Sequence, residues 1–198
     1  MAYEKKNIRA VIEEINSRKI YLPAIQRKYV WDDDQITRLM DSIMLGYPIG
    51  TFLFWKVRKS IINKKEYSMY EFIKDFHERD VYKNPSAPQP FPIGSDEETI
   101  WAVLDGQQRL TSLYIALQGS MSRKLPNKRW KNDDAFPIKE LYLDLHSQRT
   151  DEEDISYEFK FLTQEEAKKQ KDDKLWYLVK DILKYSQDEL VTDLIIPN

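Results

Sequence analysis

The chain has 198 residues, of which 41% are hydrophobic and 13% aromatic, enough for one substantial core. Its 31 basic and 33 acidic residues nearly cancel, so no global field draws it onto nucleic acid or an anionic membrane, and any such binding must be local. The absence of cysteine excludes disulfides, thiolate catalysis and sulfur-ligated zinc, and without a signal peptide or an apolar run of roughly 20 residues we expect a soluble, cytoplasmic protein.

The first residues predict a helix followed by an extended segment. Asn7 is a suitable N-cap for a helix over residues 8–17, whose apolar side chains recur at helical spacing: Ile8, Val11, Ile12 and Ile15. In residues 20–25, Pro23 cannot donate a ladder hydrogen bond and biases Leu22 away from helical geometry. We therefore expect an edge strand or a stiff loop there.

A second helix is the most clearly marked element. Asp32 can cap it, Gln35 stands where a capping box needs an amide, and Gly46 ends it. Its apolar stripe is Ile36, Leu39, Met40 and Ile43. The threonine- and aromatic-rich residues 51–57 that follow predict a buried strand.

The middle of the chain is less regular. Within residues 58–98, Met69, Phe72, Ile73 and Phe76 form a helical stripe, and prolines at positions 85, 88, 90 and 92 mark a loop. This stretch is longer than a small fold needs. We therefore expect an insertion with its own helix, which covers a pocket or binds a partner.

Residues 100–104 predict another strand, which breaks at Asp105-Gly106 and leads into a helix. The apolar face of that helix is Leu110, Leu113, Tyr114 and Leu117. Two more strands are predicted at residues 141–145 and 155–161, paired through an acidic turn at 150–154.

Beyond Thr163 the chain is charged, and one helical face is expected from Trp176, Val179, Ile182 and Leu183. The expected fold is α+β, a small mixed sheet flanked by helices. We expect one domain over residues 1–163 and, over residues 164–198, a helical C-terminal extension or the start of a further domain.

The strand, turn and helix around Asp105-Gly106 suit an anion. A helix that begins near Gln107 points its unpaired amides and the positive end of its dipole out of the sheet. Gly106 lets the backbone approach a ligand, and Arg109 offers a forked donor. The amides of Gln107 and Gln108 can orient an anion or a water. Asp105 caps the helix, holds Arg109 or positions a metal on a phosphate, and the sequence does not choose among these roles.

The structural alternative is that Asp105 is only an N-cap, that Arg109 pairs with a nearby acid, and that both glutamines are solvated. A second stretch, Gln26-Arg27-Lys28-Tyr29-Val30-Trp31, places an amide, two cations and two aromatic rings directly before the helix that Asp32 caps. It is either a binding loop or a solvated basic loop beside that helix.

Three stretches, in the same order, resemble the N-terminal domain family of GmrSD restriction endonucleases. Leu22 to Trp31 follows an I-x-x-x-Q-R-x-Y-x-W pattern, with Leu22 in place of the isoleucine. Pro48-Ile49-Gly50-Thr51 comes next, and Asp105 to Thr111 matches D-G-Q-Q-R-L-T. The resemblance covers residues 8–185 and implies a ParB/sulfiredoxin-like fold around a nucleotide pocket. Several family members belong to bacterial anti-phage systems in which this domain binds or hydrolyses nucleoside triphosphate and controls DNA cleavage by a C-terminal HNH-type nuclease domain.

The resemblance implies that Gln26 and Arg27 line the phosphate pocket on one side and that residues 105–109 close the other. Arg27 and Arg109 then neutralise phosphate charge, whereas Gln108 or Asp105 holds water or a metal. The implied catalytic residues are Asp105, Gln108 and Arg109, and the implied nucleotide-binding residues are Gln26, Arg27, Tyr29, Trp31, Gly50, Thr51, Gly106, Gln107 and Thr111. The expected ligand is a nucleoside triphosphate, with or without Mg²⁺.

Two pairs of these residues have a simpler interpretation. Tyr29 and Trp31 stack on a base or, as is more usual for aromatic rings beside a helix start, pack in the core. Gly50 and Thr51 line the pocket or only form the entry to a strand.

The chain departs from the family in the nuclease half. His77 and His146 are far apart and there is no H-x-x-x-H pattern, so an HNH-type metal site is not encoded. Sulfiredoxin chemistry is excluded because it needs a cysteine. The acidic clusters at 32–34, 96–98 and 151–154 are interpreted as solvated turns and helix starts, so we assign no metal site. The chain is a fragment or a stand-alone sensor, and a nuclease domain is its expected partner.

A basic and aromatic stretch offers a different kind of site. Arg123-Lys124 and Lys128-Arg129-Trp130-Lys131 suit one nucleic-acid strand, with cations on phosphates and the ring on a base, although a solvated loop is the simpler interpretation. Two hypotheses follow: a regulatory NTPase domain, or a DNA-binding or protein-docking module with the same fold and no NTPase activity. The intact Q-R and D-G-Q-Q-R stretches favour the first.

Overall fold

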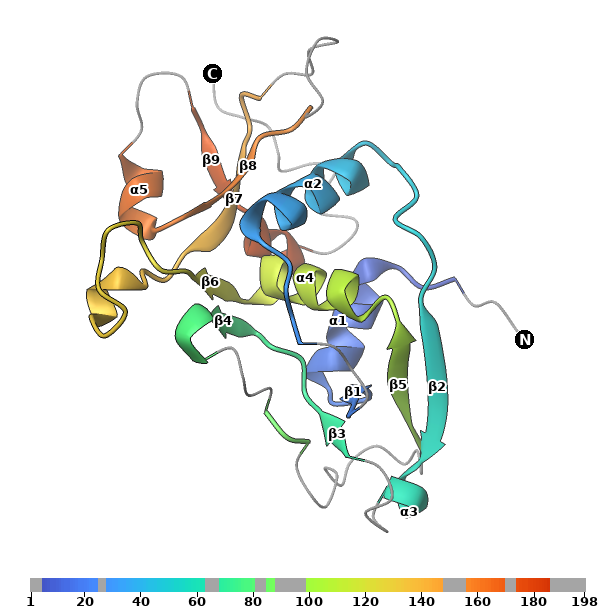
Figure 1. Cartoon of the computed structure of the whole chain (residues 1–198). Helices are drawn as coiled ribbons and strands as arrows, with labels where there is room; N and C mark the ends of the chain where they lie inside the picture. Colours follow the sequence, from blue (N-terminus) through green and yellow to red (C-terminus); the bar gives the residue numbers. More distant parts are fainter. Residues whose placement is uncertain are drawn as a thin grey trace.

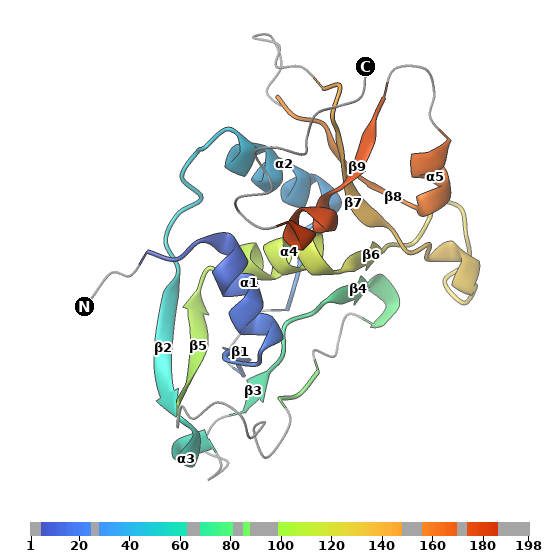
Figure 2. The same cartoon turned by 180° about the vertical axis from the view of Figure 1, so that it is seen from behind.

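The computed structural model describes residues 5–24, 28–62, 68–80, 85–87, 99–147, 156–169 and 174–185. They form the expected α+β fold, in which small sheets and helices surround one buried helix, α4 (Gln107–Gln118), in the middle of the molecule (Figures 1 and 2). Within these ranges, no helix combines the length and the apolar character that crossing a membrane requires.

The largest sheet positions the start of α4. Its strands lie in the order β2 (Leu53–Arg58), β5 (Thr99–Asp105), β1 (Ile20–Pro23), β3 (Met69–Tyr70). β1 runs parallel to β5, and the other two pairs are antiparallel. The strand predicted over residues 100–104 is thereby confirmed as β5, an internal strand that runs straight into the turn before α4.

Two expectations about this sheet are wrong. β1 is an internal strand, because Pro23 is its last residue and Ala24 donates the next hydrogen bond, to the carbonyl of Ser68 at 2.9 Å. β2 is an edge strand of which only Val57 is buried, because no strand of the described chain pairs with its outer side.

Two smaller sheets complete the β structure of the described residues. β4 (Asp75–His77) pairs in parallel with β6 (Ser120–Ser122). β7 (Glu140–Asp144) pairs antiparallel with both β8 (Phe159–Leu162) and β9 (Trp176–Leu178). The predicted pairing of residues 141–145 with 155–161 is confirmed, whereas the acidic turn predicted at 150–154 lies outside the described residues.

Two segments expected to be helical form strands. The apolar residues from Met69 to Phe76 lie in β3, in β4 and in the extended chain between them, because β1 and β6 offer pairing partners that outweigh the local spacing. The C-terminal segment is only partly helical, because Trp176 begins β9. Short helices flank that strand, α5 (Gln164–Lys168) before it and the 3₁₀-helix η3 (Val179–Lys184) after it.

The predicted helix starts are confirmed. At α1 (Ile8–Asn16) the side chain of Asn7 accepts the amide hydrogen of Ala10 at 2.7 Å. At α2 (Asp33–Met44), Asp32 and Gln35 form both bonds of a capping box. The remaining helices are short: α3 (Lys59–Ile62), η1 (Glu78–Asp80) and η2 (Asp133–Ala135).

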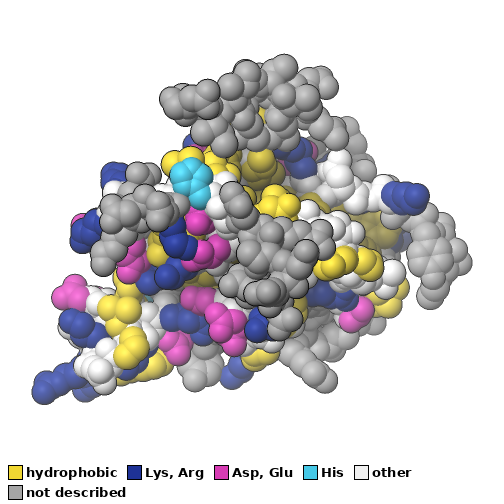
Figure 3. Space-filling model, turned by 90° about the horizontal axis from the view of Figure 1, so that it is seen from above, with side chains coloured by type: hydrophobic (Ala, Val, Ile, Leu, Met, Phe, Trp, Pro, Cys, Tyr) yellow, Lys and Arg dark blue, Asp and Glu magenta, His cyan; other side chains and the backbone are white. Residues whose placement is uncertain are grey.

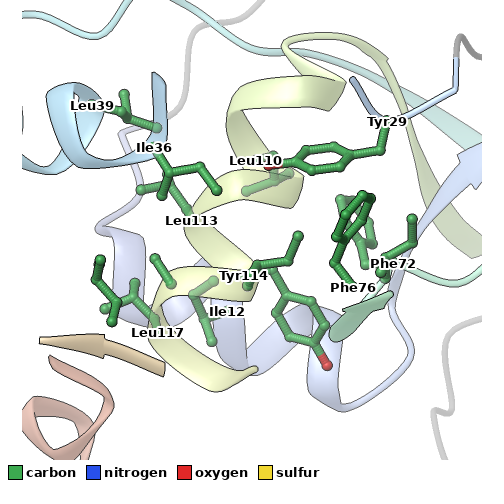
Figure 4. Close-up of a cluster of buried hydrophobic side chains, with 14 of the residues drawn as sticks. Ile12, Tyr29, Ile36, Leu39, Phe72, Phe76, Leu110, Leu113, Tyr114 and Leu117 are labelled. Atoms are coloured by element: carbon green, nitrogen blue, oxygen red, sulfur yellow. The ribbon is translucent and has the colours of Figure 1, made fainter. Parts of the chain in front are cut away.

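Helix α4 is the centre of the core. Every residue from Leu110 to Leu117 is buried, so the helix is enclosed on all sides, as interior helices are. Side chains from four other segments surround it (Figure 4): Ile12 of α1, Ile36 and Leu39 of α2, Tyr29, and Phe72 with Phe76. Because its C-terminal part is fixed in the core, the position of its first turn is fixed as well.

Candidate functional site

The turn between β5 and α4 is built on a glycine. Gly106 is the N-cap of α4 and has a φ of 84°, in the left-handed region that favours glycine. A Cβ added at Gly106 would also overlap the ring of Phe52. The predicted strand, tight turn and helix are confirmed, and the first-turn amides of α4 precede its first backbone hydrogen bond, from Leu110 to Gly106 at 2.9 Å.

Asp105 does not cap the helix. The N-cap residue is Gly106, and no side chain makes a cap hydrogen bond there. The Asp105 side chain is 72% exposed, and its carboxylate lies 3.6 Å from Nη2 of Arg109. A carboxylate with this much exposure keeps most of its hydrogen-bonding capacity for water or a bound cation.

Gln108 holds the stretch that follows Gln26 and Arg27. Its Nε2 donates to the carbonyl of Lys28 at 3.0 Å, and its Oε1 accepts the amide hydrogen of Val30 at 3.0 Å. Ile25, Gln26 and Arg27 lie outside the described residues. The two stretches that the sequence pairs in one site therefore meet through Gln108 and the backbone on either side of Tyr29.

Arg109 holds the third stretch. Its Nη1 donates to the carbonyl of Ile49, its Nη2 donates to the carbonyl of Thr51 at 2.9 Å, and its guanidinium lies 5.0 Å from the centre of the Phe52 ring. Gly50, between the two carbonyls, has a φ of 85°, and a Cβ there would overlap the guanidinium. Because Gly50 has no side chain, the guanidinium of Arg109 can donate hydrogen bonds to the carbonyls on both sides of it.

The remaining motif side chains face inward. Nε2 of Gln107 donates to the carbonyl of Val103 at 2.7 Å, and Thr111 is buried. Side chains of the D-G-Q-Q-R stretch therefore fix β5, residues 28–30 and residues 49–51 around the start of α4. The groups that remain for an anion are the first-turn amides of α4 and whatever residues 26–27 contribute.

Tyr29 and Trp31 pack inward. Tyr29 is 6% exposed, its hydroxyl lies 2.8 Å from the hydroxyl of Ser112, and its ring packs edge-to-face on Phe76 at 5.5 Å (Figure 4). Trp31 is partly buried against the same core. Its carbonyl accepts a hydrogen bond from Arg123 at 2.7 Å. In this geometry the two aromatic residues fix residues 28–32, directly before α2.

Arg123, which the sequence placed in a basic stretch, has an internal role. Its Nε donates to Asp33 at 2.6 Å, and its guanidinium lies over the Phe76 ring, 5.1 Å from the centre. Sequence analysis missed this role, as it missed those of Phe52 and Ser112. Their spacing carries no signal because the partners are distant in the chain.

Raising the pH is expected to destabilise the fold through Tyr29. Burial raises the pKa of Tyr29 from 10.0 to about 12, against the lowering effects of the Ser112 hydrogen bond and nearby Arg123. The folded state therefore keeps this proton where the unfolded chain loses it. The resulting stabilisation, on the order of 2 kcal/mol, is present below pH 10 and is lost as the pH rises from about 10 to 12.

Urea unfolding at a series of alkaline pH values measures this loss. Tyr29→Phe should lower the stability at neutral pH, because the hydroxyl of Ser112 loses its buried partner, and should flatten the decline above pH 10. Tyr47→Phe is the matched control, since that side chain is 57% exposed. An unchanged alkaline decline in Tyr29→Phe would contradict the assignment.

The other predicted binding stretch lies elsewhere. Four residues are exposed on the loop between β6 and β7: Lys128, Arg129, Trp130 and Lys131. Figure 1 shows this loop beyond the C-terminal end of α4, whereas β5 leads into the N-terminal end of that helix. On the face seen in Figure 3, Lys and Arg side chains are interspersed with Asp and Glu, in keeping with the net charge of −2. Among the described residues, no group of three or more His, Asp or Glu is arranged to hold a metal ion.

Comparison with known proteins adds to this geometry. A family model described as "GmrSD restriction endonuclease, N-terminal domain" matches residues 8–197. An uncharacterized protein of Methanocaldococcus jannaschii is 29% identical over 117 residues, which are 59% of this chain and 18% of that protein. The aligned part is thus less than a fifth of the relative's length, whereas the family match includes all three stretches that meet at the start of α4.

Proposed function

We propose, from the premise that this chain belongs to the GmrSD restriction endonuclease N-terminal domain family, that it is the nucleoside triphosphate-binding and hydrolysing regulatory domain of a DNA restriction system. The observation that carries the proposal is the convergence of three distant stretches on the first turn of α4. Gln108 holds residues 28 and 30, and Arg109 holds residues 49 and 51. Hydrogen bonds that fix the backbone around a helix start in this way are typical of a site that positions a ligand.

The phosphates are proposed to bind at the amides that begin α4. The helix contributes unpaired N–H groups and the positive end of its dipole. Gln26 and Arg27 directly precede the segment that Gln108 holds, so we assign Arg27 to the phosphate charge. Arg109 is proposed to act mainly by positioning the loop at Gly50, since its terminal nitrogens donate to carbonyls.

Hydrolysis at such a site would depend on positioning and charge stabilisation. The exposed carboxylate of Asp105 is the group best placed to hold Mg²⁺ or orient the attacking water at the rim. The expected partner is an HNH-type nuclease domain, in the same polypeptide or separate, whose DNA cleavage the nucleotide state controls. The fold expected for this activity is ParB/sulfiredoxin-like, with the nucleotide in its pocket.

The test is calorimetric titration with each of the four ribonucleoside triphosphates, with and without Mg²⁺, followed by phosphate-release assays. We expect Arg27→Ala to weaken triphosphate binding at least about tenfold, because a charge-assisted contact with phosphate is lost. Arg38→Ala is the matched control, since Arg38 is exposed on α2. Asp105→Asn should reduce phosphate release and its Mg²⁺ dependence more than it reduces binding.

Failure has a defined meaning. If none of the four triphosphates binds at millimolar concentration while the chain is folded, the domain has no nucleotide function, and the docking-module alternative replaces the proposal. If triphosphate binds and no phosphate is released, the domain is a sensor without turnover.

A further inference from the structure

The loop between β6 and β7 carries a cluster of unpaired cations. Lys128, Arg129 and Lys131 are exposed, and within the described part of the chain none of them forms an ion pair. In contrast, the neighbouring Arg79 forms an ion pair with Asp133 of the same loop at 2.8 Å. Cations without a protein partner keep their charge for an anionic ligand.

Hydrogen bonds fix the shape of this loop. The amide of Leu125 donates to the carbonyl of Ala135 at 2.7 Å, which closes the loop at its base. The amide of Asn132 donates to the carbonyl of Arg129 at 3.0 Å, and the Asn132 side chain accepts from the amide of Asp134 at 3.0 Å. The cations therefore stand on an ordered backbone, which lowers the entropic cost of binding.

A row of rings connects the loop with a groove. Trp130 is 47% exposed and packs edge-to-face on Phe136, with 5.4 Å between ring centres. Phe136 lies 4.8 Å from the ring of His77. His77 in turn lines a groove of about 530 Å³, together with Lys74 and Ile138, which is 69% exposed. The exposed indole is thus held by Phe136, and the rings of Phe136 and His77 separate it from the groove.

Cations outnumber acids on this surface. In the groove, Glu140 forms an ion pair with Lys180, and the charge of Asp75 is matched by that of Lys74, which lines the same groove. Asp134 is the exposed acid that remains on the loop beside the three cations. The local charge available to a ligand is therefore positive, although the whole chain is nearly neutral.

We infer that this surface, residues 128–131 with the adjoining groove at His77, binds a single strand of DNA or RNA. Cations neutralise the phosphates, and a base stacks on Trp130, which requires an unpaired base. A duplex keeps its bases stacked and offers this indole only phosphate and sugar. The surface lies beyond the C-terminal end of α4, away from Gly106, so the inference does not rest on the proposed nucleotide site (Figure 1).

Fluorescence anisotropy with dye-labelled oligothymidine, oligouridine and duplex DNA of equal length, over a series of salt concentrations, tests it. We expect the single strands to bind more tightly than the duplex, and the two single strands tell whether the surface distinguishes DNA from RNA. The triple variant K128Q/R129Q/K131Q should bind at least about tenfold more weakly at low salt, with the log–log salt slope smaller by about 2.

Trp130→Leu separates stacking from charge. It keeps an apolar contact on Phe136, and it should weaken single-strand binding by about fivefold or more while leaving the salt slope unchanged. The matched charge control is K160Q/K168Q/K169Q, which removes three exposed lysines elsewhere. Thermal unfolding of each variant confirms that it is folded.

Three outcomes would overturn the inference: no binding at low salt, a duplex bound as tightly as single strands, or equal weakening by the control triple. Triphosphate binding should be unchanged in the loop variants. If the loop variants lose triphosphate binding as well, the two sites are not separate.

Discussion

Replacing Gly119 by alanine is expected to lower the free energy of unfolding by about 2–3 kcal/mol, which is the upper range for overpacking a core. Gly119 ends α4, where its amide donates to the carbonyl of Ile115 at 2.9 Å. A Cβ there would overlap the backbone carbonyl of Lys74. That backbone cannot retreat freely, because Ser120 donates to the same carbonyl at 3.3 Å and Asp75 begins the β4–β6 pair.

Urea unfolding of Gly119→Ala beside Gly46→Ala measures this effect. Gly46 has a φ of 74°, but no atom lies within 4 Å of a Cβ added there, so alanine should cost only about 1 kcal/mol of backbone strain. Gly119 has an ordinary extended backbone, so its cost is steric. Equal losses of unfolding free energy in the two variants would show that the backbone of Lys74 can move away from a Cβ at residue 119.

The sequence predicted helix starts well because their physics is local. Asn7 accepts a hydrogen bond three residues away, and Asp32 with Gln35 completes a capping box within one turn. The segment from Met69 to Phe76 shows the limit of local reasoning. Its apolar spacing suits a helix, yet the strands β1 and β6, which are distant in sequence, decide the outcome.

The sequence predicted that the stretch around Tyr29 lies beside the D-G-Q-Q-R stretch, and it left open whether Gly50 and Thr51 join them. The way in which the stretches meet was not predicted. Sequence shows that Gln108 and Arg109 carry donors, and it does not show where those donors point. Their partners are backbone carbonyls and an amide at residues 28, 30, 49 and 51, and backbone groups have no residue-type signature. The charge and geometry of Arg109 fit a phosphate and a pair of carbonyls equally well.

Arg109→Lys is expected to lower the free energy of unfolding by about 1–2 kcal/mol and, on the proposed function, to weaken triphosphate binding at least about tenfold. Lysine keeps the charge, but one ammonium cannot hold the carbonyls of Ile49 and Thr51 together while stacking on Phe52. Arg38→Lys, at an exposed position on α2, is the matched control. Urea unfolding and calorimetric titration measure the two effects separately.

A double-mutant cycle with Gly50 tests whether Arg109 acts by positioning this loop. Gly50→Ala adds a Cβ that overlaps the guanidinium and imposes strain at a φ of 85°. With Arg109 present, the new Cβ must displace the guanidinium and break its hydrogen bonds to the carbonyls of Ile49 and Thr51. In an Arg109→Ala background only the backbone strain at residue 50 remains. The two losses should therefore be less than additive, by about 1 kcal/mol or more. Additive losses in stability would contradict the role of Arg109 in holding the carbonyls of Ile49 and Thr51. Full triphosphate affinity in Arg109→Lys would show that triphosphate binding does not depend on these hydrogen bonds.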